Sequence, residues 1–180
     1  MARVRIKERL RAKRFGLREA RALAAEIGED KAAVRALLRE LFGDDAEVRK
    51  RAADVSRRIT ELDPAPLERY ADELAGLLET LPPEESRTMW HLGLVVPRLA
   101  NTRERRLRAA RVMGLLAEDE SNVVRCSAVE GLGTLALAEP SLRDEAEAMV
   151  ERYLWDGTKA MKSRARAVRK MLAKRYSEAR

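Results

Sequence analysis

The chain is poor in the residue types that most often carry chemistry. Its 180 residues include one cysteine, Cys126, and one histidine, His91. A single cysteine cannot form an intrachain disulfide or a cysteine-based metal cluster, and a chain of this kind is typical of the reducing cytoplasm. A Ser–His–Asp arrangement would have to use His91, and a multi-histidine metal site cannot form. We therefore expect a cytoplasmic protein that is not an enzyme and has no cofactor and no metal.

Aromatic residues and long apolar runs are also scarce. Aromatic residues make up 4% of the chain, whereas charged residues make up 37%. A sheet is normally richer in aromatic and β-branched residues, so the abundance of Ala, Leu, Arg and Glu favours helices. No apolar run approaches the roughly 18 residues that would indicate a membrane-spanning helix, and we expect no integral membrane association. No glycine-rich phosphate loop of the GxxxxGK[ST] or GxGxxG type occurs.

The charged residues are unevenly distributed. Residues 1–21 contain nine basic and two acidic side chains, and residues 159–180 contain nine basic and one acidic. Residues 22–158 contain 19 basic and 27 acidic side chains, so two basic ends flank an acidic middle. This asymmetry concerns partners more than fold. We describe residues 1–16 as a basic N-terminal arm or helix.

Four arginines recur at an almost constant spacing. Arg49, Arg87, Arg125 and Arg164 are separated by 38, 38 and 39 residues, each near the start of an apolar-periodic segment. Self-similarity at this period is typical of stacked helix pairs. The first of these segments has apolar residues at the helical spacing of three and four, namely Val48, Ala52, Val55, Ile59 and Leu62.

Helix pairs of this length, with an arginine early in one helix, look like HEAT repeats of the armadillo type. The motifs that carry the resemblance are Asp45 with Val48-Arg49 and Ala52, and Asn122 with Val123-Val124-Arg125 and Ala128. The resemblance covers about residues 44–176, and the middle unit departs from it by having Trp90 in place of the alanine. It implies a curved solenoid whose second helices line the concave face, and binding as the default activity.

The breaks between apolar-periodic segments give the expected domain organisation. Asp63-Pro64-Ala65-Pro66 separates two helices, and the second of them is expected to run from Leu67 to Leu81. We predict a single HEAT-like domain over 17–180, with units at about 17–43, 44–83, 84–120 and 121–157 and a final half-unit at 158–180. The fold class is all-α, a right-handed α-α superhelix of about nine helices in antiparallel pairs, plus the basic N-terminal segment.

The last helix offers the clearest candidate contacts for a partner or for phosphate. An apolar stripe of Met161, Ala165, Val168 and Leu172 lies roughly opposite five basic residues: Lys162, Arg166, Arg169, Lys170 and Lys174. Such a face suits phosphate binding with counterion release, and it equally suits a solvated face that keeps the protein soluble. The N-terminal segment adds Arg5, Arg9 and Lys13, which fit either a nucleic-acid arm or a flexible or docking tail.

Other candidates are less specific. Arg105 and Arg108 belong to a cluster on the second helix of the middle unit, where they could face the groove or form ion pairs with acidic neighbours such as Asp72. Trp155 is open to a binding role. Trp90 and His91 lie in the most apolar segment, so we expect Trp90 in the core and His91 as a hydrogen-bonded core residue.

The leading functional hypothesis is a non-enzymatic scaffold or adaptor that binds another protein through its groove and edges. The alternative is nucleic-acid or ribonucleoprotein binding through the basic N- and C-terminal segments. A third reading is self-association of the basic ends with the acidic middle of a second copy, so the oligomeric state stays open. HEAT-like DNA glycosylases, which use an aromatic cleft with a nearby carboxylate, are a remote alternative, because Trp90 is followed four residues later by Leu94 instead of an acid.

Overall fold

The structure, a computed structural model, describes residues 5–28 and 30–177, and all regular secondary structure in these ranges is helical. The N-terminal arm is therefore seen from Arg5 onward and the final half-unit up to Ser177. No helix in the described ranges is long and apolar enough to cross a membrane. The helices are α1 Ile6–Leu10, α2 Leu17–Ile27, α3 Lys31–Leu41, α4 Ala46–Leu62, α5 Ala65–Glu68, α6 Ala71–Thr80, α7 Ser86–Leu99, α8 Arg103–Leu116, α9 Asn122–Ala138, α10 Arg143–Asp156 and α11 Lys159–Ser177, with 3-10 turns at Pro83–Glu85 and Pro140–Leu142.

The helix ends follow the local signals of the sequence. Asp45 caps α4, since its Oδ1 accepts hydrogen bonds from the backbone N–H groups of Glu47 and Val48, both at 3.1 Å. Asp30 caps α3 in the same way. One expectation is wrong: the helix predicted from Leu67 to Leu81 is split into α5 and α6, because the chain turns at Arg69–Tyr70 and the helix restarts at Ala71.

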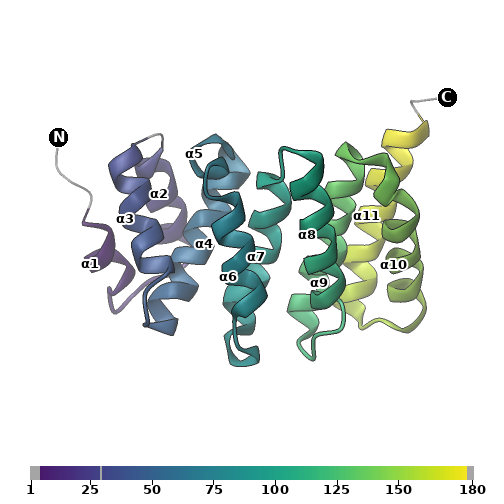
Figure 1. The fold of residues 1–180 in the computed structure, drawn as a ribbon. Helices are drawn as coiled ribbons and strands as arrows, with labels where there is room; N and C mark the ends of the chain where they lie inside the picture. Colours follow the sequence, from purple (N-terminus) through teal and green to yellow (C-terminus); the bar gives the residue numbers. More distant parts are fainter. Residues whose placement is uncertain (1–4, 29, 178–180) are drawn as a thin grey trace.

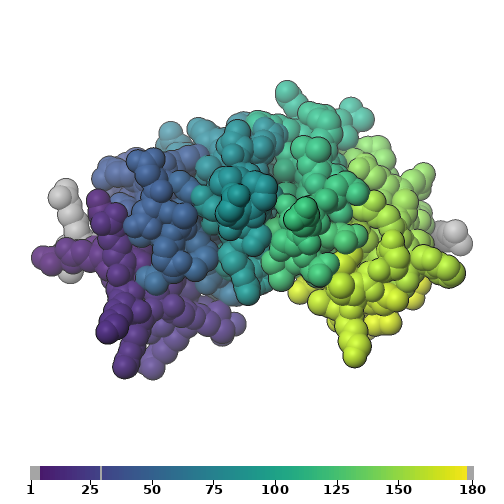
Figure 2. Space-filling view, turned by 90° about the horizontal axis from the view of Figure 1, so that it is seen from below, coloured from purple at the N-terminus to yellow at the C-terminus, as the bar shows by residue number. Residues whose placement is uncertain are grey.

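The helices stand side by side in a row of two layers (Figure 1). One layer contains α2, α4, α7, α9 and α11, and the other contains α3, α6, α8 and α10. Seen from below, the molecule is hollowed between its purple N-terminal part and its yellow C-terminal part, on the side of the first layer (Figure 2). We call this the inner layer and the other the outer layer. Each outer helix packs more extensively against the inner helix that follows it than against the one that precedes it.

Glycines allow the inner helices to approach one another closely. A Cβ atom on Gly131 of α9 would lie 2.9 Å from the carbonyl oxygen of Gly93 on α7, and one on Gly93 would lie 3.1 Å from Ser127 Cβ. Gly133 of α9 likewise faces Val168 of α11 without room for a side chain. The inner helices therefore pack backbone against backbone at these points, and the row bends toward them.

The outer helices are instead bridged by long side chains. Arg105 of α8 donates to Asp72 Oδ2 of α6 at 2.7 Å, and Arg108 donates to Glu79 Oε2 at 2.9 Å. Of the two readings of these arginines, the structure shows the one with ion pairs between neighbouring helices. They lie on the outer layer, so the reading in which they face the groove is wrong. The reason is that the packing groups each outer helix with the inner helix that follows it. In units divided this way the second helices are the inner ones, so α8 is a first helix and lies on the outer layer.

The N-terminal segment is docked through α1. Ile6 and Leu10 of α1 are almost fully buried, at 2% and 0% exposure, against α3 and α4. Arg51 of α4 donates to the carbonyl oxygens of Leu10 at 2.7 Å and Ala12 at 2.8 Å. The described part of this segment is therefore docked through Ile6 and Leu10, while its basic side chains Arg5 and Lys13 remain exposed.

Two identical substitutions test the close approach of α7 and α9. Gly131→Ala should lower the free energy of unfolding by about 1–3 kcal/mol, because the new methyl group has no space between the helices. Gly114→Ala on α8 should raise it by about 0.5–1 kcal/mol, since nothing lies within 4 Å of its Cβ position and alanine costs less backbone entropy in a helix. Urea denaturation measures both. Equal effects of the two changes would contradict the close approach.

Candidate binding face

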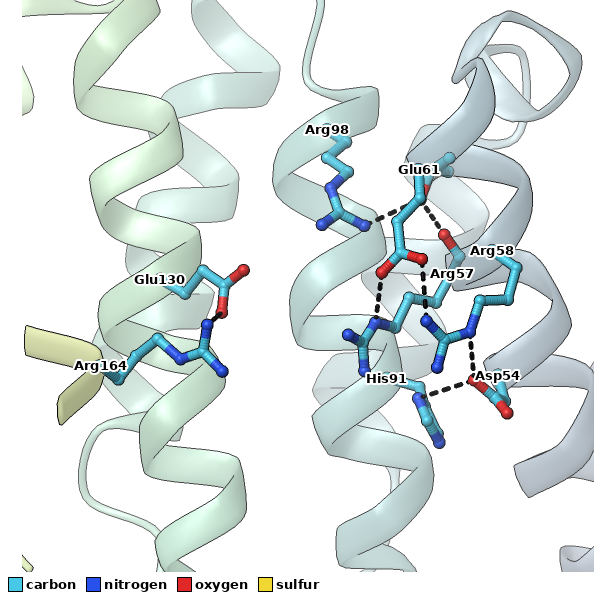
Figure 3. Close-up of polar contacts among 9 residues, drawn as sticks. Asp54, Arg57, Arg58, Glu61, His91, Arg98, Glu130 and Arg164 are labelled. Carbon is cyan, nitrogen blue, oxygen red and sulfur yellow. Dashed lines mark hydrogen bonds and ion pairs between the residues drawn. The ribbon is translucent and has the colours of Figure 1, made fainter. Parts of the chain in front are cut away.

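A ladder of charged side chains runs along α4 on the inner layer (Figure 3). Arg58 Nε donates to Asp54 Oδ1 at 3.2 Å, and its Nη1 donates to Glu61 Oε2 at 2.9 Å. Arg57 Nε donates to the other oxygen of Glu61 at 2.9 Å. Residues three and four apart face the same side of a helix, so this spacing brings the four side chains together.

Neighbouring helices extend the ladder toward the C-terminus. Arg98 of α7 donates from Nη1 to Thr60 Oγ1 at 3.3 Å, and Arg164 of α11 pairs with Glu130 of α9 at 2.9 Å (Figure 3). Together with Arg87 of α7, these residues place five arginines and three carboxylates on the inner face. We call this set the inner-face ladder: Asp54, Arg57, Arg58, Glu61, Arg87, Arg98, Glu130 and Arg164.

Glu61 and Arg98 of the ladder keep their charges at neutral pH. Burial raises the pKa of Glu61, but the hydrogen bond from Arg58 and the charges of Arg57 and Arg58 outweigh it and lower the pKa overall. Burial lowers the pKa of Arg98, partly offset by Glu61 and Glu130, and an arginine so shifted still stays protonated. The inner face is therefore a fixed array of both signs with an excess of positive charge.

Trp90 and His91 lie beside the ladder, and both depart from expectation. Trp90 is not in the core: it is half-buried, with the Arg57 and Arg87 guanidinium carbons 5.0 and 5.6 Å from its ring centroid. His91 is buried, at 7% exposure, but its Nδ1 has no hydrogen-bond partner and lies 3.7 Å from Asp54 Oδ1. Burial lowers the pKa of His91 to about 4, against the raising effect of Asp54, so the ring is neutral at pH 7.

A hollow of about 430 Å³ opens between this pair and the start of α2. Phe15, Gly16 and Leu17 form one wall, and Arg87, Trp90 and His91 form the opposite wall. The α4 side of the hollow carries Glu47, Lys50, Arg51, Asp54 and Arg58. It is a concave site that mixes apolar and charged groups, as ligand and peptide sites do.

The structure does not bring the N-terminal candidates to this face. Arg5 is exposed and precedes α1, where it pairs with Glu8 at 3.3 Å. Arg9 pairs with Glu26 of α2, so it holds two helices together. Lys13 is exposed in the loop between α1 and α2.

The candidates on α11 lie together as predicted. Its apolar stripe is buried, and the basic side chains stand on the remaining surface, where Lys162 is half-buried and Arg166, Arg169, Lys170 and Lys174 are exposed. Arg169 lies 3.6 Å from Glu151, which is the one ion pair that the five form with described residues. Trp155, at the end of α10, is 88% exposed and free to bind a partner.

The inner-face ladder was missed, although the sequence contains a signal for it. Arg98 is the one charged residue between Trp90 and Leu99, and Glu130 is the one acidic residue of α9. An isolated charge in an otherwise apolar helix needs a partner on a neighbouring helix. Neither the partner nor the layer can be identified without the packing.

His91 gives this face a pH dependence that can be measured. Between pH 6.5 and about 4, His91 binds a proton in the unfolded chain but not in the folded chain. The free energy of unfolding therefore falls as the pH falls through this range. The loss amounts to at most ~1.4 kcal/mol per pH unit for one proton. His91→Gln removes this proton-linked loss. The free energy of unfolding of the wild type relative to the variant, measured by urea denaturation, should therefore fall between pH 7 and about 5. Parallel stability curves for the two proteins would contradict the assignment.

Comparison with known proteins does not assign a function to this face. No protein-family model, curated protein or solved structure matches the chain. Among the described residues, no group of histidine, cysteine and carboxylate side chains is placed to hold a metal ion. The geometry of the inner face and the charges of α11 are therefore the observations from which a function can be argued.

Proposed function

We propose that the chain is a non-enzymatic HEAT-like α-solenoid that binds another protein along its inner face and edges. The observation that carries the proposal is the inner-face ladder on the hollowed side of the molecule, in which Arg57, Arg58 and Arg164 are paired with carboxylates. Extended concave surfaces of stacked helix pairs are general protein-binding surfaces. Arginine and tryptophan are also the residues most enriched at energetically important interface positions, and Trp90 lies between Arg57 and Arg87.

The alternation of signs on the ladder favours a protein partner over a nucleic acid. Asp54, Glu61 and Glu130 interrupt the row of arginines, so a phosphate backbone following the hollow would meet a carboxylate on each of α4 and α9. A protein surface can present both signs and satisfy both. Arg57, Arg58 and Arg164 are also held by neighbouring carboxylates, which reduces the side-chain entropy lost when another protein binds.

A matched pair of charge reversals tests the proposal. Arg164 on the inner layer is 46% exposed and pairs with Glu130 at 2.9 Å, whereas Arg152 on the outer layer is 41% exposed and pairs with Glu118 at 2.6 Å. Arg164→Glu should reduce capture of a cognate partner from host extract at least ~10-fold, a loss of about 1.4 kcal/mol in binding free energy. Capture should be quantified for the full chain, and circular dichroism should show that both variants remain helical.

Arg152→Glu is the control and should leave capture within about twofold of wild type, because exposed pairs away from an interface contribute little. Equal capture by the two variants would show that the inner face is not the binding face. Loss with Arg152→Glu alone would move the interface to the outer layer.

The second candidate is nucleic-acid binding, and the basic surface of α11 is the specific observation that favours it. Four of its five candidate cations make no ion pair with a described residue, so they can meet phosphate without first breaking an internal contact. Phosphate contacts release counterions and give a steep salt dependence.

Titration with duplex DNA and structured RNA at several salt concentrations tests this candidate. If the α11 cations hold phosphate, replacing Lys162, Arg166, Arg169 and Lys170 with glutamate should abolish binding. The wild-type slope of log affinity against log salt should then be about −3 to −4 for four contacts. Absence of binding at low salt would remove nucleic acid as a candidate and leave the protein partner.

A further inference from the structure

The hollow beside Trp90 combines three apolar side chains with an excess of cations. Phe15 and Trp90 are half-buried and Leu17 is 51% exposed, so an apolar surface faces the opening. Singly exposed apolar residues are ordinary, but here three from two separate segments line one concavity, as apolar residues do in ligand and interaction sites. Its volume of about 430 Å³ lies within the range of ligand pockets and can hold one or two side chains.

The cations of the hollow differ in how far they are already engaged. Lys50 and Arg51 both pair with Glu47, and Arg58 pairs with Asp54 and Glu61. Arg87 is exposed and makes no ion pair within the described residues; its contact is with the Trp90 ring, 5.6 Å from the guanidinium carbon. Arg87 is therefore the group that can take a new carboxylate, through its two parallel N–H donors, without displacing an existing partner.

Neutral His91 gives the hollow an uncharged polar lining beside Trp90. Its Nδ1 is buried without a hydrogen bond, and its ring lies against Trp90 with centroids 4.5 Å apart. The Trp90 ring is thus suited to an apolar group, and the guanidinium of Arg87 beside it is suited to an anion.

We propose that this hollow anchors an acidic linear segment of the partner protein, which places one aromatic or aliphatic side chain against Trp90 and Leu17 and a neighbouring carboxylate on Arg87. The inference rests on the protein-binding function proposed above and names the kind of segment that binds. A polyphosphate backbone fits less well, because Glu47 and Asp54 line the same space and because the apolar wall has no partner in a phosphate chain.

Trp90 can report on its own site once the other tryptophan is removed. The chain contains two tryptophans, and Trp155→Phe removes the second one from the end of α10, outside the lining of the hollow, while it keeps an aromatic ring at that position. The full chain with this change should be titrated with a short acidic peptide that has a central phenylalanine, and with the same peptide carrying alanine at the centre. We expect the fluorescence of Trp90 to change on saturation with the first peptide and the alanine peptide to bind at least ~5-fold more weakly.

Two charge reversals of equal size separate the site from general attraction of an acidic peptide. Arg87→Glu, in the Trp155→Phe background, should weaken the phenylalanine peptide at least ~10-fold. Arg152→Glu, in the same background, changes the net charge equally but lies on α10 in the outer layer, and it should leave the affinity within about twofold. Equal weakening by both variants, or equal affinity for both peptides, would overturn the proposal. Displacement of the peptide by a short oligonucleotide of equal charge, at equal or lower concentration, would overturn it in favour of phosphate.

Failure of this inference can be told apart from failure of the proposed function. If neither peptide binds while Arg164→Glu still reduces partner capture and Arg152→Glu does not, the hollow is wrong as the anchor and the inner face stands. If neither peptide binds and Arg164→Glu leaves partner capture unchanged, the protein-binding function itself is wrong.

Discussion

The close approach of α7 and α9 is the constraint from which the rest of the structure follows. Gly93 and Gly131 let the two backbones meet where any side chain would collide. Since the inner helices pack this tightly, the outer helices on the far side of the row are spread apart, and the row is hollowed on the inner side (Figure 2). The spread outer helices are then joined by the long reach of Arg105 and Arg108 to α6. The need for these long ion pairs on the outer layer therefore follows from the close packing that the two inner glycines allow.

The same packing gives the inner face its electrostatic character. Helices in close contact bring isolated charges such as Arg98 and Glu130 into a partly dehydrated surface, where each needs partners nearby. The partners found on α4 and α11 fix the side chains in one arrangement (Figure 3). Fixed arginines bind a carboxylate with less loss of conformational freedom than mobile ones do, so the ion pairs that stabilise the fold little still prepare it for binding.

The sequence predicts the helices well and their faces less well, and the four recurring arginines show why. Arg49 and Arg125 are each the fourth residue of their helices, and both point to the next pair, Arg49 to Glu85 and Arg125 to the Tyr153 ring. Arg87 is the second residue of α7 and Arg164 the sixth of α11, so they share a different side, the inner face. A shift of two residues along a helix moves a side chain by about 200° around the helix axis. Arginines at a regular spacing of about 38 residues in the chain therefore have two different structural roles. Periodicity, proline breaks and aspartate caps are local and could be read directly, whereas the layer of each helix depends on glycine contacts between units.

Helix α11 contributes to both basic surfaces of the molecule, and this links their roles. Arg164 belongs to the inner-face ladder, whereas Arg166 and Lys170 stand exposed on the same helix. Exposed charges at the rim of an interface act mainly on the rate of encounter and are screened by salt, while held charges within it act mainly on the rate of dissociation. The exposed cations of α11 would therefore speed the association of an acidic protein segment, and the inner-face ladder would slow its dissociation. Salt should then slow association far more than it speeds release, a pattern that a phosphate site on α11 alone would not produce.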